Sequence, residues 1–326
     1  MAMVLTLLWL LMQPAGAVEH EGLVWQWDDD EHRRWYLETE VHLPLIMWFV
    51  ADQNRQARVV TFQVRTILDC AKQKELNRRS WMVECAVEDF ALIAAAVSAD
   101  EGELAPILNE IDRKLSAATL QVVLRRDGRV VNIDLEGVEK KNRRISRMTE
   151  NLRLVMARVI AGMDLQLPKQ GKTKDPWLQR EALLMATPSV VGTLGAAELV
   201  HGITHTEGAV RIIESAGTGT LAPGEQGAMG ATRNLYTMQI AGMAVFDTQQ
   251  GLLRERVWTV LGKPTASSEV SEGGAGLPYW QRGRLLLLDP TDKRSVGDTK
   301  EVAPPGRSPT TLEQWTPLGT DPGQAP

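Results

Sequence analysis

The chain of 326 residues carries 36 basic and 41 acidic side chains, which gives a net charge of −5. This acidic balance argues against a general nucleic-acid binder, which normally carries a basic excess. The length is sufficient for one large domain or two ordinary ones, each with a core of its own.

The first 17 residues, MAMVLTLLWLLMQPAGA, contain no charged side chain. Their apolar stretch, Met3 to Met12, is too short to span a bilayer, and the small residues at 15–17 suit a signal peptidase. We therefore predict a signal peptide over residues 1–17 and export to the periplasm or the extracellular space. Because no basic residue precedes the apolar stretch, a misplaced start and a buried apolar strand are the alternatives. No later apolar run approaches the roughly 20 residues of a membrane-spanning helix, so no transmembrane segment is expected in the mature chain.

Residues 22–43, GLVWQWDDDEHRRWYLETEVHL, alternate aromatic and polar side chains around an acidic corner. This pattern predicts a hairpin with an apolar face of four large side chains, Trp25, Trp27, Trp35 and Leu37. The corner could bind a cation through its four acidic side chains, Asp28, Asp29, Asp30 and Glu31. It lacks the alternating ligands, central glycine and distal glutamate of an EF-hand loop, so a solvated turn is the favoured interpretation.

The two cysteines, Cys70 and Cys85, lie in strand-like segments over residues 58–70 and 80–92, with a polar stretch between them. A hairpin would bring them together, and in an oxidising compartment this predicts a disulfide. Two buried thiols are the alternative. The spacing does not match the CxxC pattern of zinc sites.

Helical spacing of apolar residues follows, and it predicts a helix near residues 104–115. The next stretch, VVLRRDGRVVNIDL, predicts a hairpin with Asp127 and Gly128 in a two-residue type I′ turn. In that register Arg126 faces Arg129, and the apolar pairs are Leu124 with Val131, Val122 with Ile133, and Leu120 with Leu135. An amphipathic pattern then predicts a longer helix near residues 142–163.

The second half is expected to be rich in strands. We predict a β-rich first half over residues 18–168, a connecting segment over 169–182, a β-rich second half over 183–295 in the same or a second domain, and a disordered tail over 296–326. A hairpin is expected to turn at residues 206–208. In a second hairpin, Phe246 should face Leu253. Four apolar residues of the first strand should share the face of Phe246: Tyr236, Met238, Ile240 and Ala244. Val257 and Leu261 of the second strand should share the face of Leu253. A last strand is predicted in YWQRGRLLLLDP.

Two histidines in the first of these hairpins, His201 and His205, are four residues apart and should share one face of a strand. They could hold a metal ion if a third ligand came from elsewhere, but no HExxH motif or carboxylate cluster accompanies them. A GxSxG nucleophile elbow is absent from the sequence, and QLPKQGKT has Gln166 where a phosphate-binding loop needs its first glycine. No catalytic residue and no cofactor is therefore predicted.

The segments LQVVLRRDGRVVNIDLEG and GMAVFDTQQGLLRERVWTV, with the predicted helix between them, resemble uncharacterised bacterial exported proteins built as β-meanders around a long helix. The resemblance covers about residues 110–260. It implies a location in the cell envelope, and no functional residue can be carried over from it.

These patterns together predict a mainly β (α+β) fold, a curved antiparallel β-meander with one or two packing helices. Two functions compete. The first is a non-enzymatic envelope protein that binds an apolar or lipid-like ligand, or a protein partner, in the concave face, for which ten tryptophans and twelve methionines supply adaptable apolar surface. The second is a secreted hydrolase whose site is assembled from distant residues.

Overall fold

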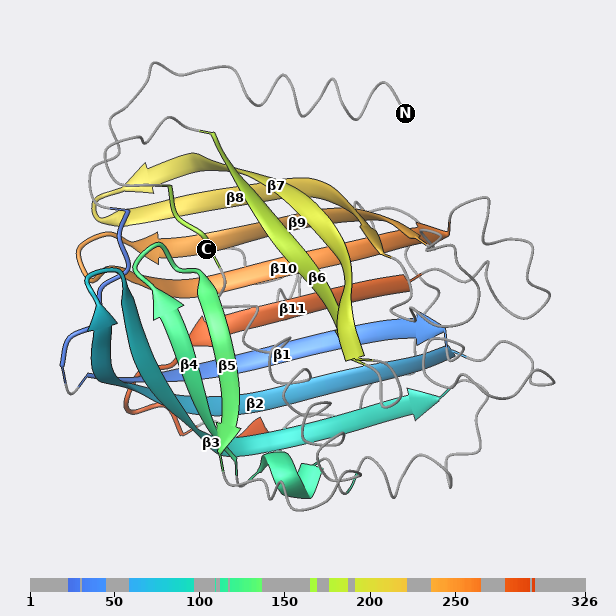
Figure 1. The fold of residues 1–326 in the computed structure, drawn as a ribbon, viewed down its shortest axis with the longest axis horizontal. Coiled ribbons are helices and arrows are strands. Elements are labelled where there is room, and N and C mark those ends of the chain that lie inside the picture. Colours follow the sequence, from blue (N-terminus) through green and yellow to red (C-terminus); the bar gives the residue numbers. More distant parts are fainter. Residues whose placement is uncertain are drawn as a thin grey trace.

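A computed structural model describes residues 23–29, 31–44, 59–96, 109, 112–116, 118–136, 165–168, 176–186, 191–221, 236–264, 279–293 and 295–296. Their strands form a single 11-stranded sheet in the order β5-β4-β3-β2-β1-β11-β10-β9-β8-β7-β6 (Figure 1). The bounds are β1 His32–Pro44, β2 Val59–Asn77, β3 Ser80–Ala96, β4 Thr119–Arg125, β5 Val130–Glu136, β6 Trp177–Ala186, β7 Val191–Glu207, β8 Val210–Leu221, β9 Tyr236–Asp247, β10 Leu252–Pro264 and β11 Tyr279–Leu287. The predicted mainly β, antiparallel meander is confirmed.

Strands that are neighbours in the sheet are, with one exception, also neighbours in the chain. Strands that follow one another in the chain pair with each other, except β5 and β6, and β1 pairs with β11. Because every ladder is antiparallel, β5 and β6 run in the same direction, as their arrows in Figure 1 show. A tight turn cannot join two parallel strands, which accounts for the long connection over residues 137–176. The predicted helix at 142–163 falls in this connection, outside the described residues.

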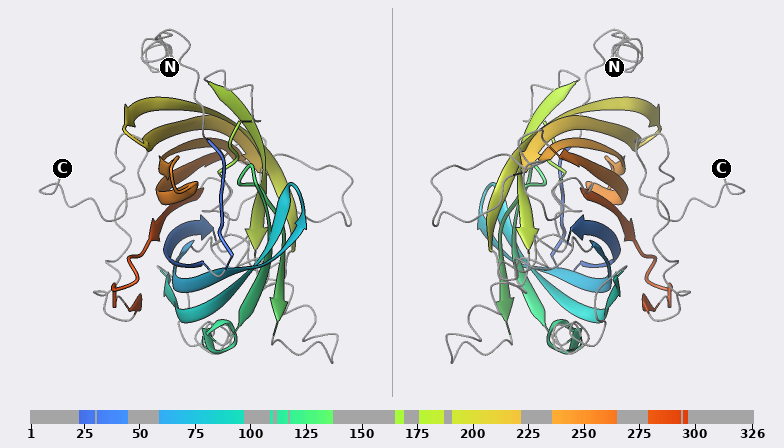
Figure 2. Two further views of the ribbon diagram at one scale, coloured as in Figure 1. Left: turned by 90° about the vertical axis from the view of Figure 1, so that its left-hand side faces the viewer. Right: turned by 90° about the vertical axis from the view of Figure 1, so that its right-hand side faces the viewer.

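The sheet bends strongly, so that it has a concave inner face and a convex outer face (Figure 2). Glycines permit part of this bend. A Cβ atom on Gly217 of β8 would collide with the Glu198 carbonyl of β7, and one on Gly219 would lie 2.7 Å from the Ala196 carbonyl. Adjacent backbones therefore approach more closely here than any side chain would allow.

The main core lies on the inner face at the end of the sheet that carries the β2–β3, β4–β5 and β9–β10 turns. Two segments close this end, residues 23–28 and 165–168, which we call the plug. Trp25 donates its backbone N–H to the Arg126 carbonyl (3.2 Å), and the Leu167 N–H donates to the Asp127 carbonyl (2.7 Å). The Trp25 side chain is fully buried and meets the ring of Phe246 edge-on at 5.9 Å. Burial of large apolar side chains such as these is the dominant stabilising term of the fold.

The predicted hairpin at residues 22–43 is wrong, because its first half forms part of the plug. Only its second half is a strand, β1, while residues 23–28 are not in a strand. Gln26 donates its N–H to the Gly251 carbonyl at the β9–β10 turn (2.7 Å). The backbone groups of this segment are thus satisfied by turns of other hairpins, and its tryptophans bury themselves across the end of the sheet instead of along β1.

The β4–β5 hairpin has most of the predicted register, with one error at the turn. Val122 pairs with Ile133 and Leu120 with Leu135, as expected, but Leu124 pairs with Val130 and Val131 is 57% exposed. The loop has three residues because Gly128 adopts a φ of +82° after the turn, and this geometry creates a bulge. Arg126 consequently does not face Arg129. It forms an ion pair with Glu75 (3.2 Å).

The predicted inner face of β10 is wrong because this strand contains a second bulge. Phe246 pairs with Leu253, as expected, but the register shifts between Leu253 and Glu255. The extra residue places Arg256, Trp258 and Val260 on the inner face, where Val257 and Leu261 were expected.

Several further expectations can be compared with the structure. The β7–β8 hairpin turns at residues 208–209, the last strand is β11, and residues 112–115 are helical within the predicted 104–115. Strand β6 begins at Trp177, inside the expected connecting segment, and both halves of the chain supply strands to the same sheet. Residues 1–17 and 297–326 lie outside the described residues.

Among the described residues, the outer face of the sheet carries ion pairs and a small apolar cluster. Glu38 pairs with Arg65 (3.0 Å) and Glu255 with Arg284 (2.8 Å). The cluster consists of Tyr36, Ile67, Leu288 and Val296. The Val296 N–H donates to the Asp89 carboxylate (2.8 Å), so the segment after β11 is held against the outer face.

Candidate functional site

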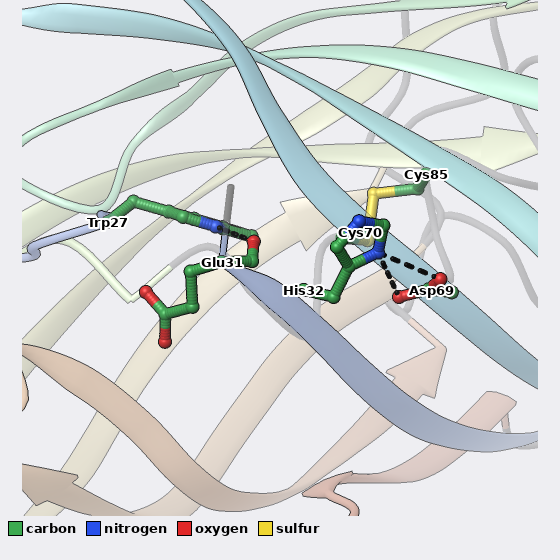
Figure 3. The surroundings of a disulfide bond; sticks show 6 residues. All are labelled: Trp27, Glu31, His32, Asp69, Cys70 and Cys85. Atoms are coloured by element: carbon green, nitrogen blue, oxygen red, sulfur yellow. Dashed lines mark hydrogen bonds and ion pairs between the residues drawn. A yellow bond between two sulfur atoms is a disulfide. The ribbon is translucent and has the colours of Figure 1, made fainter. Parts of the chain in front are cut away.

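The disulfide is part of the main core. Cys70 of β2 and Cys85 of β3 are directly opposite each other, their sulfur atoms are bonded at 2.00 Å, and both side chains are almost fully buried (Figure 3). On the strand beside it, the exposed His32 ring lies 3.0 Å from the Asp69 carboxylate. A fully buried disulfide has no access to a thiol substrate, which favours a structural role.

The acidic corner before β1 is used to hold the plug. Asp29 pairs with Lys72 (2.6 Å), and Glu31 pairs with the buried guanidinium of Arg33 (2.7 Å), which also lies 4.5 Å from the Trp27 ring centroid. Burial alone would raise the pKa of Glu31, but hydrogen bonds from Arg33 and its charge together hold it below the usual value. Asp28 is exposed.

A metal site is not visible in the part of the chain that the structure describes, which holds no group of three or more His, Cys, Asp or Glu side chains suited to a metal ion. Asp30 lies outside that part, so cation binding at the acidic corner stays the untested alternative to the predicted solvated turn.

The inner face carries a band of polar side chains beyond the main core. Directly paired residues place Trp177 of β6, His201 of β7 and Ser215 of β8 in one row across the sheet. His205 does not join this row. A bulge between Ile203 and His205 turns the His205 side chain to the opposite face, so the expected shared face of the two histidines is wrong.

His201 is fully buried and uses both ring nitrogens. Nδ1 lies 2.6 Å from Ser215 Oγ, and Nε2 lies 2.9 Å from Gln179 Oε1. The Gln166 N–H of the plug donates to the same Gln179 oxygen (3.0 Å), which marks that atom as an acceptor. Nε2 must therefore carry the proton, and Nδ1 accepts the hydrogen bond from the Ser215 hydroxyl. The ring also stacks on Trp177, with centroids 5.4 Å apart.

This environment keeps His201 neutral. Burial and, second, the positive charge of Arg256 lower its pKa from 6.5 to about 3. At neutral pH the ring is a poor base, because a general base works best with a pKa near the operating pH. The spacing of Ser215 and His201 matches that of a nucleophile and its base. However, burial, the low pKa and a neutral amide as third group all oppose that chemistry.

Three further residues extend the polar band toward β1. Arg256 is 7% exposed and faces inward, because it is paired with Ala244 and Leu285 of the main core. Its guanidinium carbon lies 5.8 Å from the Trp258 ring centroid, and the Trp258 ring covers Gly283, leaving no space for a Cβ there. Thr39 pairs with Gly283 on the far side, and its buried hydroxyl oxygen has no hydrogen-bond partner.

Beyond the polar band the inner face becomes apolar again. Four buried side chains, which we call the distal patch, lie here on β7, β9 and β10: Leu199, Met238, Ile240 and Val260. They do not belong to the main core. On β8, Gly217 and Gly219 are paired with Ile240 and Met238, so small residues alternate with large ones across the patch.

Sequence reasoning found the apolar faces better than the polar band. It did not single out Gln179, Ser215, Arg256 or Thr39. Only Arg256 follows a bulge; the other three lie on separate strands and share no local pattern. A usable signal was present in β8, where a serine occupies an inward position between Ile213 and Gly217.

Comparisons with known proteins identify no family. No family model matches the sequence, and no curated protein matches it. One similar solved structure, which concerns lipid–protein interactions in lipovitellin, has a TM-score of 0.47 and 7% sequence identity. The match covers 81% of this chain and 26% of the other, so this chain spans about a quarter of its length. The β-meander implied by the sequence resemblance is confirmed, and no family is assigned.

Among the residues that the structure describes, no helix has the length and apolar character needed to cross a membrane.

Proposed function

We propose that this chain is a non-enzymatic protein of the cell envelope that binds an apolar ligand on the inner face of its sheet, at the distal patch. The observation that carries the proposal is the position of Leu199, Met238, Ile240 and Val260. They form a second apolar region on the inner face, separated from the main core by the polar band. If these four side chains only extended the main core behind the plug, no polar side chains would be expected between the two apolar regions.

The composition of the distal patch suits an acyl chain or a similar ligand. Its side chains are apolar and between 1% and 8% exposed, and ligand sites are lined predominantly by apolar side chains. Each buried methylene group of a ligand would contribute about 0.8 kcal/mol. The flexible Met238 side chain can adopt different conformations for different ligands. Gly217 and Gly219, which are paired with Ile240 and Met238, add no side chain to the patch.

A location in the envelope is supported by two observations. The disulfide between Cys70 and Cys85 is typical of proteins that fold in an oxidising compartment. The first 17 residues carry the features of a signal peptide. N-terminal sequencing of the protein from its own envelope fraction tests this part, with Val18 expected as the first residue.

Quenching of tryptophan fluorescence by a brominated ligand tests the binding site. Trp258 borders the distal patch on the inner face, so the methyl ester of dibrominated stearic acid should quench it. We expect saturable quenching that decreases in Trp258→Phe. Trp280→Phe is the matched control, because Trp280 lies on the same pair of strands but faces outward.

The expected result is a smaller quenching amplitude in Trp258→Phe and an unchanged one in Trp280→Phe. Absence of saturable quenching in the wild-type protein, or equal losses in both variants, would overturn the proposed site.

A further inference from the structure

We infer that the ligand is an amphiphile with one carboxylate head group, bound by Arg256 and Thr39 at the polar band, with its apolar chain on the distal patch. The inference rests on the proposed function and adds the chemical class of the ligand. It concerns the head group, which the apolar patch alone does not specify.

The first reason is the position of Arg256. Its side chain is 7% exposed and faces inward. Trp258 is the next inward residue along β10, and Val260 of the distal patch is the one after it. A guanidinium is charged at every accessible pH, and its attraction to an anion grows as water is removed. Its planar fork also matches the two oxygens of a carboxylate.

The second reason is independent of charge. Thr39 is 3% exposed, and its hydroxyl has no hydrogen-bond partner, which is unusual for a buried polar group. It lies across Gly283 from Trp258. A carboxylate oxygen of the ligand next to Thr39 would give this hydroxyl the acceptor that the described residues do not provide.

His201 does not take part in binding the head group. Both of its nitrogens are engaged by Ser215 and Gln179, and it stays neutral beside Arg256. The ring therefore offers no donor to a ligand, whereas Arg256 places a positive charge beside it on the inner face. A cationic head group would meet the wrong charge here.

A comparison of dibrominated stearic acid with its methyl ester tests the inference, since the two differ only in head-group charge. At neutral pH the wild-type protein should bind the acid about tenfold more tightly than the ester. Arg256→Met should remove this difference and leave the affinity for the ester unchanged. Arg284→Met is the matched control, because Arg284 lies on the adjacent strand and pairs with Glu255 on the outer face.

Thr39→Val gives a second, isosteric test. Because it removes an unsatisfied hydroxyl, it should raise the melting temperature of the free protein. It should also weaken binding of the acid several-fold and leave the ester unaffected. Arg256→Lys, which keeps the charge, should keep part of the preference for the acid and covers the case in which Arg256→Met does not fold.

The outcomes separate the two proposals. Equal affinity for acid and ester in the wild-type protein, or the same loss in Arg284→Met as in Arg256→Met, would overturn the head-group assignment while the proposed function stands. Absence of binding by both probes would overturn the proposed function and this inference with it.

Discussion

His201 Nδ1 and Ser215 Oγ lie 2.6 Å apart across the β7–β8 ladder, buried on the inner face of the sheet. The serine hydroxyl donates to a ring whose other nitrogen donates to Gln179. This network satisfies every hydrogen-bonding atom of a fully buried imidazole, and it does so only in the neutral form. The consequences are a pH dependence of stability and the absence of a useful catalytic base.

The first prediction concerns that pH dependence. The pKa of His201 falls from 6.5 to about 3 on folding, first because of burial and then because of Arg256. Between these values the unfolded chain holds one more proton at this residue than the native protein does. The contribution is therefore fully present above pH 6.5 and is lost as the pH falls toward 3, by about 1.4 kcal/mol per pH unit.

Urea unfolding at several pH values between 7 and 4 would measure this slope. His201→Gln should reduce it by the contribution of one proton, whereas His205→Gln, at an exposed position on the same strand, should not change it. An identical slope in wild type and His201→Gln would show that the imidazole titrates normally in the folded protein.

The second prediction concerns Ser215. Because its neighbouring base has a pKa of about 3 and the hydroxyl is buried, Ser215 should not react with a fluorophosphonate probe at neutral pH. Intact-protein mass spectrometry after incubation with the probe is the measurement. An adduct mapped to Ser215, absent in Ser215→Ala, would instead support the alternative of a secreted hydrolase.

The third prediction compares two turn glycines. Gly128 has a φ of +82°, and a Cβ atom there would collide with the Trp25 side chain and the Leu165 carbonyl of the plug. Gly128→Ala should cost about 3 kcal/mol of unfolding free energy, from backbone strain and from the displaced plug.

Gly208→Ala is the matched control for this variant. Gly208 also has a positive φ, +54°, but no atom lies within 4 Å of its Cβ position. Only the backbone strain of about 1 kcal/mol should remain there. Equal losses in the two variants, measured by urea unfolding, would mean that the plug does not press on the β4–β5 turn.

The fourth prediction concerns the disulfide. Its loop spans 15 residues, so replacing both cysteines with alanine should cost about 3 kcal/mol in stability. Since both sulfur atoms are buried in the main core, dithiothreitol should reduce the bond only as fast as the protein opens. Alkylation followed by mass spectrometry measures the rate, with and without urea. Rapid reduction in the absence of urea would contradict the buried position of the bond.

Local patterns were sufficient to predict most strands and the four hairpins β2–β3, β4–β5, β7–β8 and β9–β10. Alternation placed Leu120 opposite Leu135 and Phe246 opposite Leu253, and both pairs are found. Such pairs are predictable because a strand with one buried face tolerates only one register.

Errors arose where an extra residue entered a strand. The bulges in β7 and β10 reversed the expected faces of His205 and Val257. A bulge depends on the backbone of the partner strand and on turn geometry, and neither leaves a clear mark in the alternation of a single strand. Arg256 was missed for the same reason, because it faces inward only as a result of the bulge before it.

The sequence by itself determined the mainly β class, the antiparallel meander, four of its hairpins and the pairing of the two cysteines, because each depends on residues close together in the chain or on a single ladder. Only the tertiary structure decided that residues 23–28 close the end of the sheet, that β1 pairs with β11, and that His201, Ser215, Arg256 and Thr39 meet on one face. These contacts join residues far apart in the chain, and they are selected by the burial of Trp25 and by the bend of the whole sheet, which no local pattern encodes.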